Sequence, residues 1–156
     1  MLAESLQAAT SVDFEFAEAH GIKVVRRLTG GGAVFHDLGN VNYTFIVPKS
    51  DAPCDFRAFS EPIIEALASL GISAECSGRN DLLADGRKFS GTARCEYASH
   101  FGTLVMHHGT LLFDADISRL TGALKIDPEK IRSKGIKSTA SRVVNLSSLL
   151  PSCFCA

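Results

Sequence analysis

The stretch that decides the fold is Arg26–Asp37, which reads RRLTGGGAVFHD. Three consecutive glycines leave backbone N–H groups uncovered and reach conformations closed to other residues. Successive N–H groups in such a turn form a concave anion site, and the two arginines add cations that bind phosphate or carboxylate. Composition alone fits a flexible surface turn equally well, but the apolar residues on both sides favour an ordered loop. We therefore expect an anionic ligand to lie across it.

This loop is not one of the common nucleotide-binding loops. The chain has no GxGxxG motif, and the spaced glycines of Gly86–Gly91 are followed by Thr92 where a P-loop has lysine. A nucleotide, if bound, must therefore be held in another way.

Outward from the loop, apolar periodicity and turn residues predict an α+β domain with a mixed, largely antiparallel sheet packed with helices. Its length of 156 residues fits a single domain over 1–156. We expect helices at Asp13–His20, Phe56–Leu70, Ile117–Leu124 and Pro128–Arg132. We expect strands at Lys23–Leu28, Ala33–Phe35, Asn42–Val47, Ser73–Cys76, Asp81–Ala84, Lys88–Tyr97 and Thr103–Phe113.

A second candidate site lies around the turn Asp85-Gly86, a hairpin signal. Arg87 and Lys88 follow it, and neighbouring strand residues point to opposite faces, so one of them can face a cleft. Asp81 begins the preceding strand and could hold Mg²⁺, whose octahedral shell suits carboxylates and phosphates. Taken alone, this pattern fits solvated surface charges better than a site.

Two further segments carry polar side chains. His107 and His108 are adjacent in an expected strand, so they face opposite ways and cannot easily share a metal; one of them is expected to be structural. The segment Lys134–Thr139 combines lysines, a glycine and hydroxyls, and it could close over a phosphate. Its composition fits a solvated linker better.

Composition excludes several function classes. The net charge of −1 implies no bulk attraction to nucleic acid or to a membrane surface. The five cysteines lack paired CxxC spacing, which argues against zinc and is typical of a reduced protein. The start has no secretory pattern, and charges or glycines interrupt every apolar run before it reaches membrane-spanning length. We therefore expect a cytoplasmic protein.

Four ordered blocks resemble lipoate–protein ligases of the biotin and lipoate ligase superfamily. They are RRLTGGGAVFHDLGN (Arg26–Asn40), GRNDLLADGRKFSG (Gly78–Gly91), HHGTLLFD (His107–Asp114) and KGIKSTASRVVNL (Lys134–Leu146). Four blocks at suitable spacing are far more specific than any one of them. The resemblance implies the catalytic-domain fold of that superfamily, an α+β domain built on a mixed sheet.

The resemblance also implies a reaction and a set of site residues. The expected reaction activates lipoate with ATP and Mg²⁺ to lipoyl-AMP, then transfers the lipoyl group to a carrier lysine. Lys88 is similar to the family's essential lysine. The implied contacts to ATP and lipoyl-adenylate are Arg27, Gly30, Gly31, Gly32, Ala33, Val34, Phe35, Lys88, Lys134, Gly135 and Ile136.

The implied partners are lipoate and the lipoyl carrier domains of 2-oxoacid dehydrogenase complexes or the glycine cleavage H protein. Compared with the family, few residues precede Gly21 and no C-terminal accessory domain follows, so we expect a shortened catalytic domain. Two alternatives stay open. One is an ATP-independent octanoyl or lipoyl transferase, in which Cys76 or Cys95 could be a nucleophile. The other is a non-catalytic domain that binds lipoate or nucleotide.

Overall fold

The computed structural model describes residues 2–4, 11–30, 32–50, 56–77, 80–100, 102–125 and 142–151. The strands are β1 (Leu2–Glu4), β2 (Val24–Arg26), β3 (Val34–Phe35), β4 (Asn40–Pro48), β5 (Ala74–Ser77), β6 (Asp81–Ala84), β7 (Arg87–Ser99) and β8 (Gly102–Leu112). The helices are α1 (Phe14–Ala19), α2 (Phe56–Ser69) and α3 (Ile117–Ala123), followed by a short 3₁₀ helix (Leu146–Leu149).

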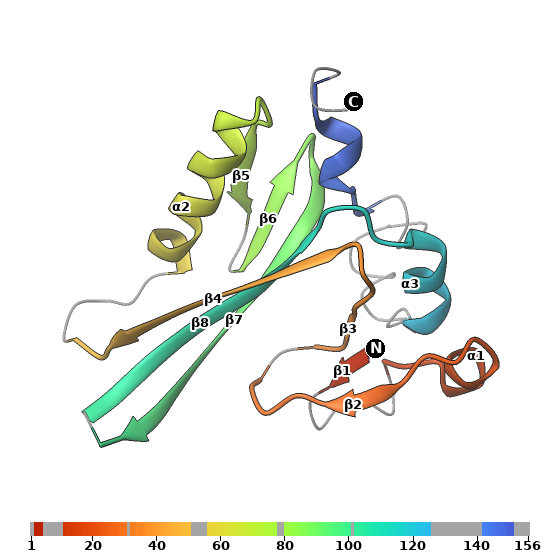
Figure 1. Cartoon of the computed structure of the whole chain (residues 1–156), viewed down its shortest axis with the longest axis horizontal. Coiled ribbons are helices and arrows are strands. Elements are labelled where there is room, and N and C mark those ends of the chain that lie inside the picture. Colours follow the sequence, from red (N-terminus) through yellow and green to blue (C-terminus); the bar gives the residue numbers. More distant parts are fainter. Residues whose placement is uncertain are drawn as a thin grey trace.

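Two sheets organise these elements (Figure 1). The larger has the order β4-β8-β7-β6-β5 with every pair antiparallel, and the smaller has the order β2-β1-β3 with β1 and β2 parallel. The expected α+β class with a mixed, largely antiparallel arrangement is confirmed. Strand β1 was not predicted from the sequence, and the expected helix Pro128–Arg132 lies outside the described residues.

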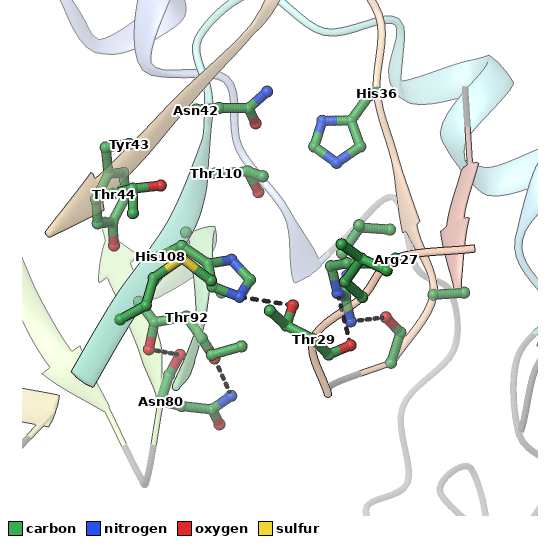
Figure 2. A pocket seen from close by; sticks show the side chains of 18 of the residues that line it. Arg27, Thr29, His36, Asn42, Tyr43, Thr44, Asn80, Thr92, His108 and Thr110 are labelled. Carbon is green, nitrogen blue, oxygen red and sulfur yellow. Dashed lines mark hydrogen bonds between the residues drawn. The ribbon is translucent and has the colours of Figure 1, made fainter. Parts of the chain in front are cut away.

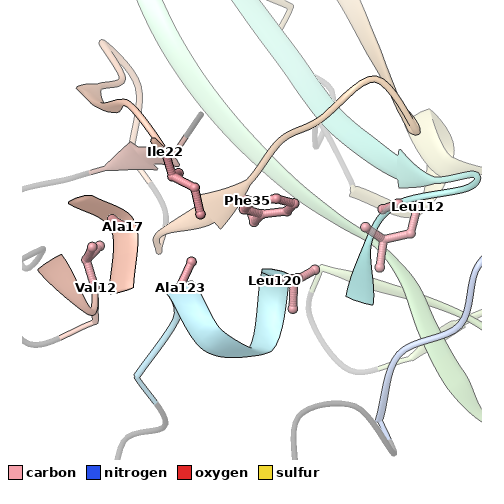
Figure 3. Close-up of a cluster of buried hydrophobic side chains, with 8 residues drawn as sticks. Val12, Ala17, Ile22, Phe35, Leu112, Leu120 and Ala123 are labelled. Atoms are coloured by element: carbon pink, nitrogen blue, oxygen red, sulfur yellow. The ribbon is translucent and has the colours of Figure 1, made fainter. Parts of the chain in front are cut away.

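Two separate clusters of buried hydrophobic residues form the core. The first packs α1 against α3 and β3 (Figure 3), and includes Val12, Ala17, Ile22, Phe35, Leu112, Leu120 and Ala123. The second lies between α2, β5, β6 and the C-terminal segment, and includes Leu67, Ile72, Leu82, Ala84, Phe89, Val144 and Leu146. The core is therefore divided between two clusters.

Helix ends follow the sequence signals. Asp13 caps α1 by accepting a hydrogen bond from the Phe16 N–H at 2.9 Å. Asp116 caps α3 by accepting from the N–H groups of Ser118 and Arg119, both at 3.0 Å. Such caps satisfy amide groups that have no partner within the helix.

One face of the large sheet packs under α2. Along β8, Gly109 and His107 lie on this face, and the ring of Phe59 stacks on His107 with centroids 3.9 Å apart. The ring of Tyr43 on β4 crosses Gly109 so closely that a Cβ there would lie 2.5 Å from its hydroxyl oxygen. Because strand side chains alternate, the neighbours of these β8 residues point to the opposite face.

A β-bulge in β7 changes that alternation near the Asp85-Gly86 turn. Leu82 pairs with Ser90 and Leu83 pairs with Lys88, so Phe89 is an extra residue in β7. The bulge sends the fully buried Phe89 side chain into the second cluster. Lys88 consequently shares a face with Gly91, although the two lie three positions apart in an otherwise alternating strand.

Candidate functional site

A cavity of about 480 Å³ lies between the glycine loop and the face of the large sheet opposite α2 (Figure 2). The loop between β2 and β3 forms one wall, and β4, β7 and β8 form the other. The lining residues are Arg27, Leu28, Thr29, Gly32, Ala33, Val34, His36, Asn42, Tyr43, Thr44, Asn80, Lys88, Gly91, Thr92, Ala93, Met106, His108, Gly109 and Thr110. Its volume suits a small-molecule ligand.

Arg27 organises the glycine loop from within. Its Nη2 donates to the carbonyl oxygens of Gly30 and Gly32 at 2.9 and 3.0 Å, and its Nε donates to the Thr29 carbonyl at 3.3 Å. Burial lowers the pKa of Arg27 from its ordinary value, but a guanidinium stays protonated in proteins. The loop is therefore folded around a fixed positive charge at the cavity wall.

The loop is also tied to the large sheet. The Thr29 hydroxyl lies 2.8 Å from Nε2 of His108, and Figure 2 shows this hydrogen bond joining the loop to β8. Burial lowers the pKa of His108, and the nearby charge of Arg27 lowers it further. Both effects favour a neutral imidazole, which can donate with one ring nitrogen and accept with the other.

Lys88 brings a second cation to the cavity. Its Nζ lies 2.7 Å from Oδ1 of Asp81, and both side chains are about two-fifths exposed. On the side of β7 away from β6, a hydrogen bond fixes the backbone of Lys88, because its carbonyl accepts from the Val144 N–H at 3.0 Å. An exposed ion pair of this kind is weak, so the lysine can exchange its carboxylate partner for an incoming anion.

Asn80 closes one end of the cavity. Its Nδ2 donates to the Thr92 carbonyl at 2.8 Å, and its own carbonyl accepts from the Thr92 N–H at 3.0 Å. These bonds hold the start of β6 against β7, beside the Asp81–Lys88 pair.

His36 and Asn42 line a second cavity of about 450 Å³ as well as the first. In Figure 2 the His36 ring projects toward the centre of the site. Burial lowers the pKa of His36, nearby positive charge that includes Arg27 lowers it further, and Asp37 acts in the opposite direction. A mainly neutral ring therefore stands between the two cavities.

The structure brings together most of the predicted site residues. Those that line the cavity are Arg27, Gly32, Ala33, Val34 and Lys88. Gly30 belongs to the loop held by Arg27, and Asp81 pairs with Lys88. The predicted residues Gly31, Lys134, Gly135 and Ile136 lie outside the described residues.

The side chain of Phe35, one of the predicted ligand contacts, does not line this cavity. It is 4% exposed and packs in the first hydrophobic cluster, and the ligand contact at this residue stays a prediction. Phe35 follows Val34 in β3, and neighbouring strand residues point to opposite faces. The side chain of Val34 therefore faces the cavity, and that of Phe35 faces the hydrophobic cluster. Phe35 therefore supports the loop from behind.

Sequence reasoning missed several polar lining residues. They include Asn42, Thr44, Asn80, Thr92, His108 and Thr110. Alternation along the expected strand could have placed His108 and Thr110 on one face, but only the paired register joins that face to β4. Among the described residues no group of three or more His, Cys, Asp and Glu side chains could hold a metal ion. No described helix is long and apolar enough to cross a membrane.

Comparisons with known proteins agree on one family. Residues 5–154 match the model of the lipoyl protein ligase A/B catalytic domain. The lipoate–protein ligase LplJ of Bacillus subtilis is 49% identical over 140 residues, which cover 89% of this chain and 41% of that protein. The chain thus spans about two-fifths of the length of this curated relative.

Solved structures share the fold. A bipartite lipoate–protein ligase from Thermoplasma acidophilum, described with its E2 lipoyl domain, superposes with a TM-score of 0.79 at 30% identity, covering 96% of this chain and 60% of that one. A lipoate–protein ligase A bound with ATP gives 0.76 at 27% identity, covering 94% and 60%. With a family match over nearly its whole length, this chain belongs to the lipoyl protein ligase A/B catalytic-domain family.

Proposed function

We propose that the chain activates lipoate with ATP to lipoyl-AMP and transfers the lipoyl group to a lysine of a carrier domain. The observation that carries the proposal is the pair of cations, Arg27 and Lys88, on a cavity of about 480 Å³ walled by a glycine loop. Family membership and the ATP-bound relative support it.

Two displacement steps make up the proposed reaction. A lipoate carboxylate oxygen attacks the α-phosphorus of ATP, forming an O–P bond while the bond to pyrophosphate breaks. The carrier amine then attacks the lipoyl carbonyl carbon, forming an amide while the bond to AMP breaks and the amine loses a proton. The first step brings two anions together, so fixed cations and positioning are the main requirements.

Lys88 would stabilise the charge that develops between carboxylate and phosphorus. It would act as an electrostatic clamp, with no covalent bond to the substrate. The weak pairing with Asp81 at 2.7 Å holds its Nζ near the cavity before the substrates arrive. Removing a single such donor costs roughly a hundredfold or more in rate in other enzymes.

We also propose that Asp81 helps to hold Mg²⁺ when ATP is bound. One partly exposed carboxylate beside the cavity fits this role, because Mg²⁺ is usually held by one or two carboxylates together with substrate phosphates and water. When bound, the ion would neutralise phosphate charge. When the Lys88 ammonium pairs with the substrate in place of Asp81, the Asp81 carboxylate would be available to bind Mg²⁺.

The proposed acceptors are lipoyl domains of 2-oxoacid dehydrogenase complexes or the glycine cleavage H protein, and the proposed location is the cytoplasm. The Thermoplasma relative, described with its E2 lipoyl domain, supports the first class. The segment Lys134–Ser138, which lies outside the described residues, is proposed to close over the adenylate, in keeping with its two lysines and its glycine.

Neither thiol considered for an ATP-independent transferase lines the cavity. Cys76 lies exposed on β5 and Cys95 is partly buried on β7, both as free cysteines. A cysteine nucleophile would have to reach the acyl carbonyl, so this geometry favours the ATP-dependent ligase.

The test incubates the chain with lipoate, ATP and Mg²⁺ and measures pyrophosphate and lipoyl-AMP. Wild type should produce both, and Lys88→Ala should lose activity by about a hundredfold or more with unchanged circular dichroism. Arg87→Ala is the matched control, because Arg87 precedes Lys88, pairs with Asp85 and does not line the cavity. A well-folded wild type that forms neither product would contradict the proposal.

A further inference from the structure

We propose that His108 is a positioning residue that fixes the glycine loop through the hydroxyl of Thr29. This inference rests on the proposed function, because it concerns how the same cavity is kept ready for its substrates. The central observation is the 2.8 Å hydrogen bond between Thr29 Oγ1 and His108 Nε2, which joins residues 79 positions apart.

The two partners belong to different parts of the fold. Thr29 stands in the loop between β2 and β3, next to the small sheet, whereas His108 lies in the middle of β8. Pairing with Thr44 on β4 and Ala93 on β7 holds His108 from both sides. A residue fixed in this way is a firm anchor for a more exposed loop.

The loop has little apolar anchorage around Thr29, although Ala33 at its far end packs against the first hydrophobic cluster. The side chain of Leu28, directly before Thr29, is completely exposed, and Gly30 and Gly32 offer none. The hydrogen bonds of Arg27 go to carbonyl groups of the loop itself, so they shape the loop without tying it to the large sheet. The Thr29–His108 bond supplies that connection.

The local charges suit this role. Burial and Arg27 both favour the neutral imidazole of His108, and a neutral ring can either accept the threonine proton or donate to the threonine oxygen. The bond therefore persists in either tautomer without placing another cation beside Arg27. Its effect on catalysis would be indirect, through the position of the loop that walls the cavity.

The geometry predicts a specific kinetic pattern. Thr29→Val removes the hydroxyl at nearly constant volume and His108→Leu removes its partner, so each should raise KM for lipoate about threefold to tenfold, which is the usual worth of one hydrogen bond. The value of kcat should change by less than about twofold, because the reacting groups remain. Thr29→Ser keeps the hydroxyl and should stay near wild type.

A double-mutant cycle separates positioning from direct substrate contact. If Thr29 acts through His108, the double variant Thr29→Val/His108→Leu should be no worse than either single variant. Additive losses, with Thr29→Val costing as much in the His108→Leu background as in wild type, would overturn the inference. His100→Leu is the matched control, because His100 is exposed and does not line the cavity.

A second readout needs no turnover. The Nε2 resonance of His108 in ¹⁵N-edited NMR of the ligand-free chain should move in Thr29→Val and keep its wild-type position in Thr29→Ser. An unchanged resonance in Thr29→Val would show that the bond is not formed. A chain that shows the NMR shift but forms no lipoyl-AMP would instead contradict the proposed function.

Discussion

Lys88 folds back over Gly91: a Cβ at position 91 would lie 3.1 Å from Nζ and 3.3 Å from Cε of the lysine. The β-bulge at Phe89 puts both residues on the cavity face. The absence of a side chain at position 91 therefore sets where the proposed catalytic cation rests, between the cavity and the carboxylate of Asp81.

Gly91→Ala should lower the rate of adenylation roughly tenfold, because small displacements of a reacting group are costly. The fold should survive, since the atoms that must move are the far end of a flexible side chain and no positive φ is required at this position. The measurements are the initial rate of pyrophosphate release and the melting temperature. An unchanged rate would show that the lysine reaches its working position by another path.

Gly109→Ala should act on stability instead. The new Cβ would meet the ring of Tyr43 at 2.5 to 2.9 Å, and that ring lies across β8 with the ring of Phe45 beside it. Overpacking of this kind costs about 1 to 3 kcal/mol of unfolding free energy. Urea denaturation measures the loss.

The matched test for the cause is Tyr43→Ala/Gly109→Ala. Removing the ring should cancel most of the penalty at position 109, so the two losses should be strongly non-additive. Additive losses would mean that the alanine disturbs something other than Tyr43.

The elements near the site show which features of the fold can be predicted from the sequence. Asp81–Ala84 was predicted with its observed bounds, and the Asp85-Gly86 turn was predicted as a hairpin; both residues have positive φ, at 51° and 67°. These features depend on local preferences that sequence patterns record. Strand β1 was missed because its three residues join the small sheet through pairing with β2 and β3, which lie far along the chain.

The sequence pointed to the two cations of the cavity, Arg27 and Lys88, but not to the contacts that shape its walls. The glycines after two arginines, with apolar residues on both sides, predicted an ordered anion-binding loop at Arg27, and the resemblance added Lys88. The partnership of Thr29 with His108 depends on two sheets meeting in space, and nothing local to either residue encodes it. The bulge that turns Phe89 inward was equally hidden, because RKFSG also reads as a regular strand.

His107 offers a prediction about pH. It is 2% exposed, with Phe59 stacked on its ring and the edge of Phe56 against it. Burial lowers its pKa from the ordinary value of 6.5, and the charges of Arg94 and His108 lower it further. The folded chain therefore binds fewer protons at this ring than the unfolded chain does at mildly acidic pH.

The sign of the stability change follows from this difference. The contribution of a neutral buried His107 is fully present above the ordinary pKa of 6.5 and is lost as pH falls below it toward the lower folded value. One histidine can change the unfolding free energy by at most about 1.4 kcal/mol per pH unit. His36 and His108, whose pKa values are also lowered, add slopes of the same sign.

Urea denaturation of wild type at several pH values between about 7.5 and 5.5 should show the unfolding free energy falling as the solution becomes more acidic. His107→Phe keeps an aromatic ring against the two phenylalanines but cannot take up a proton. Its unfolding free energy should therefore fall less steeply with decreasing pH than that of wild type, whatever its absolute stability. His100→Phe, at an exposed position, should keep the wild-type slope. If His107→Phe and wild type lose stability in parallel, the protonation that destabilises the fold occurs at another residue.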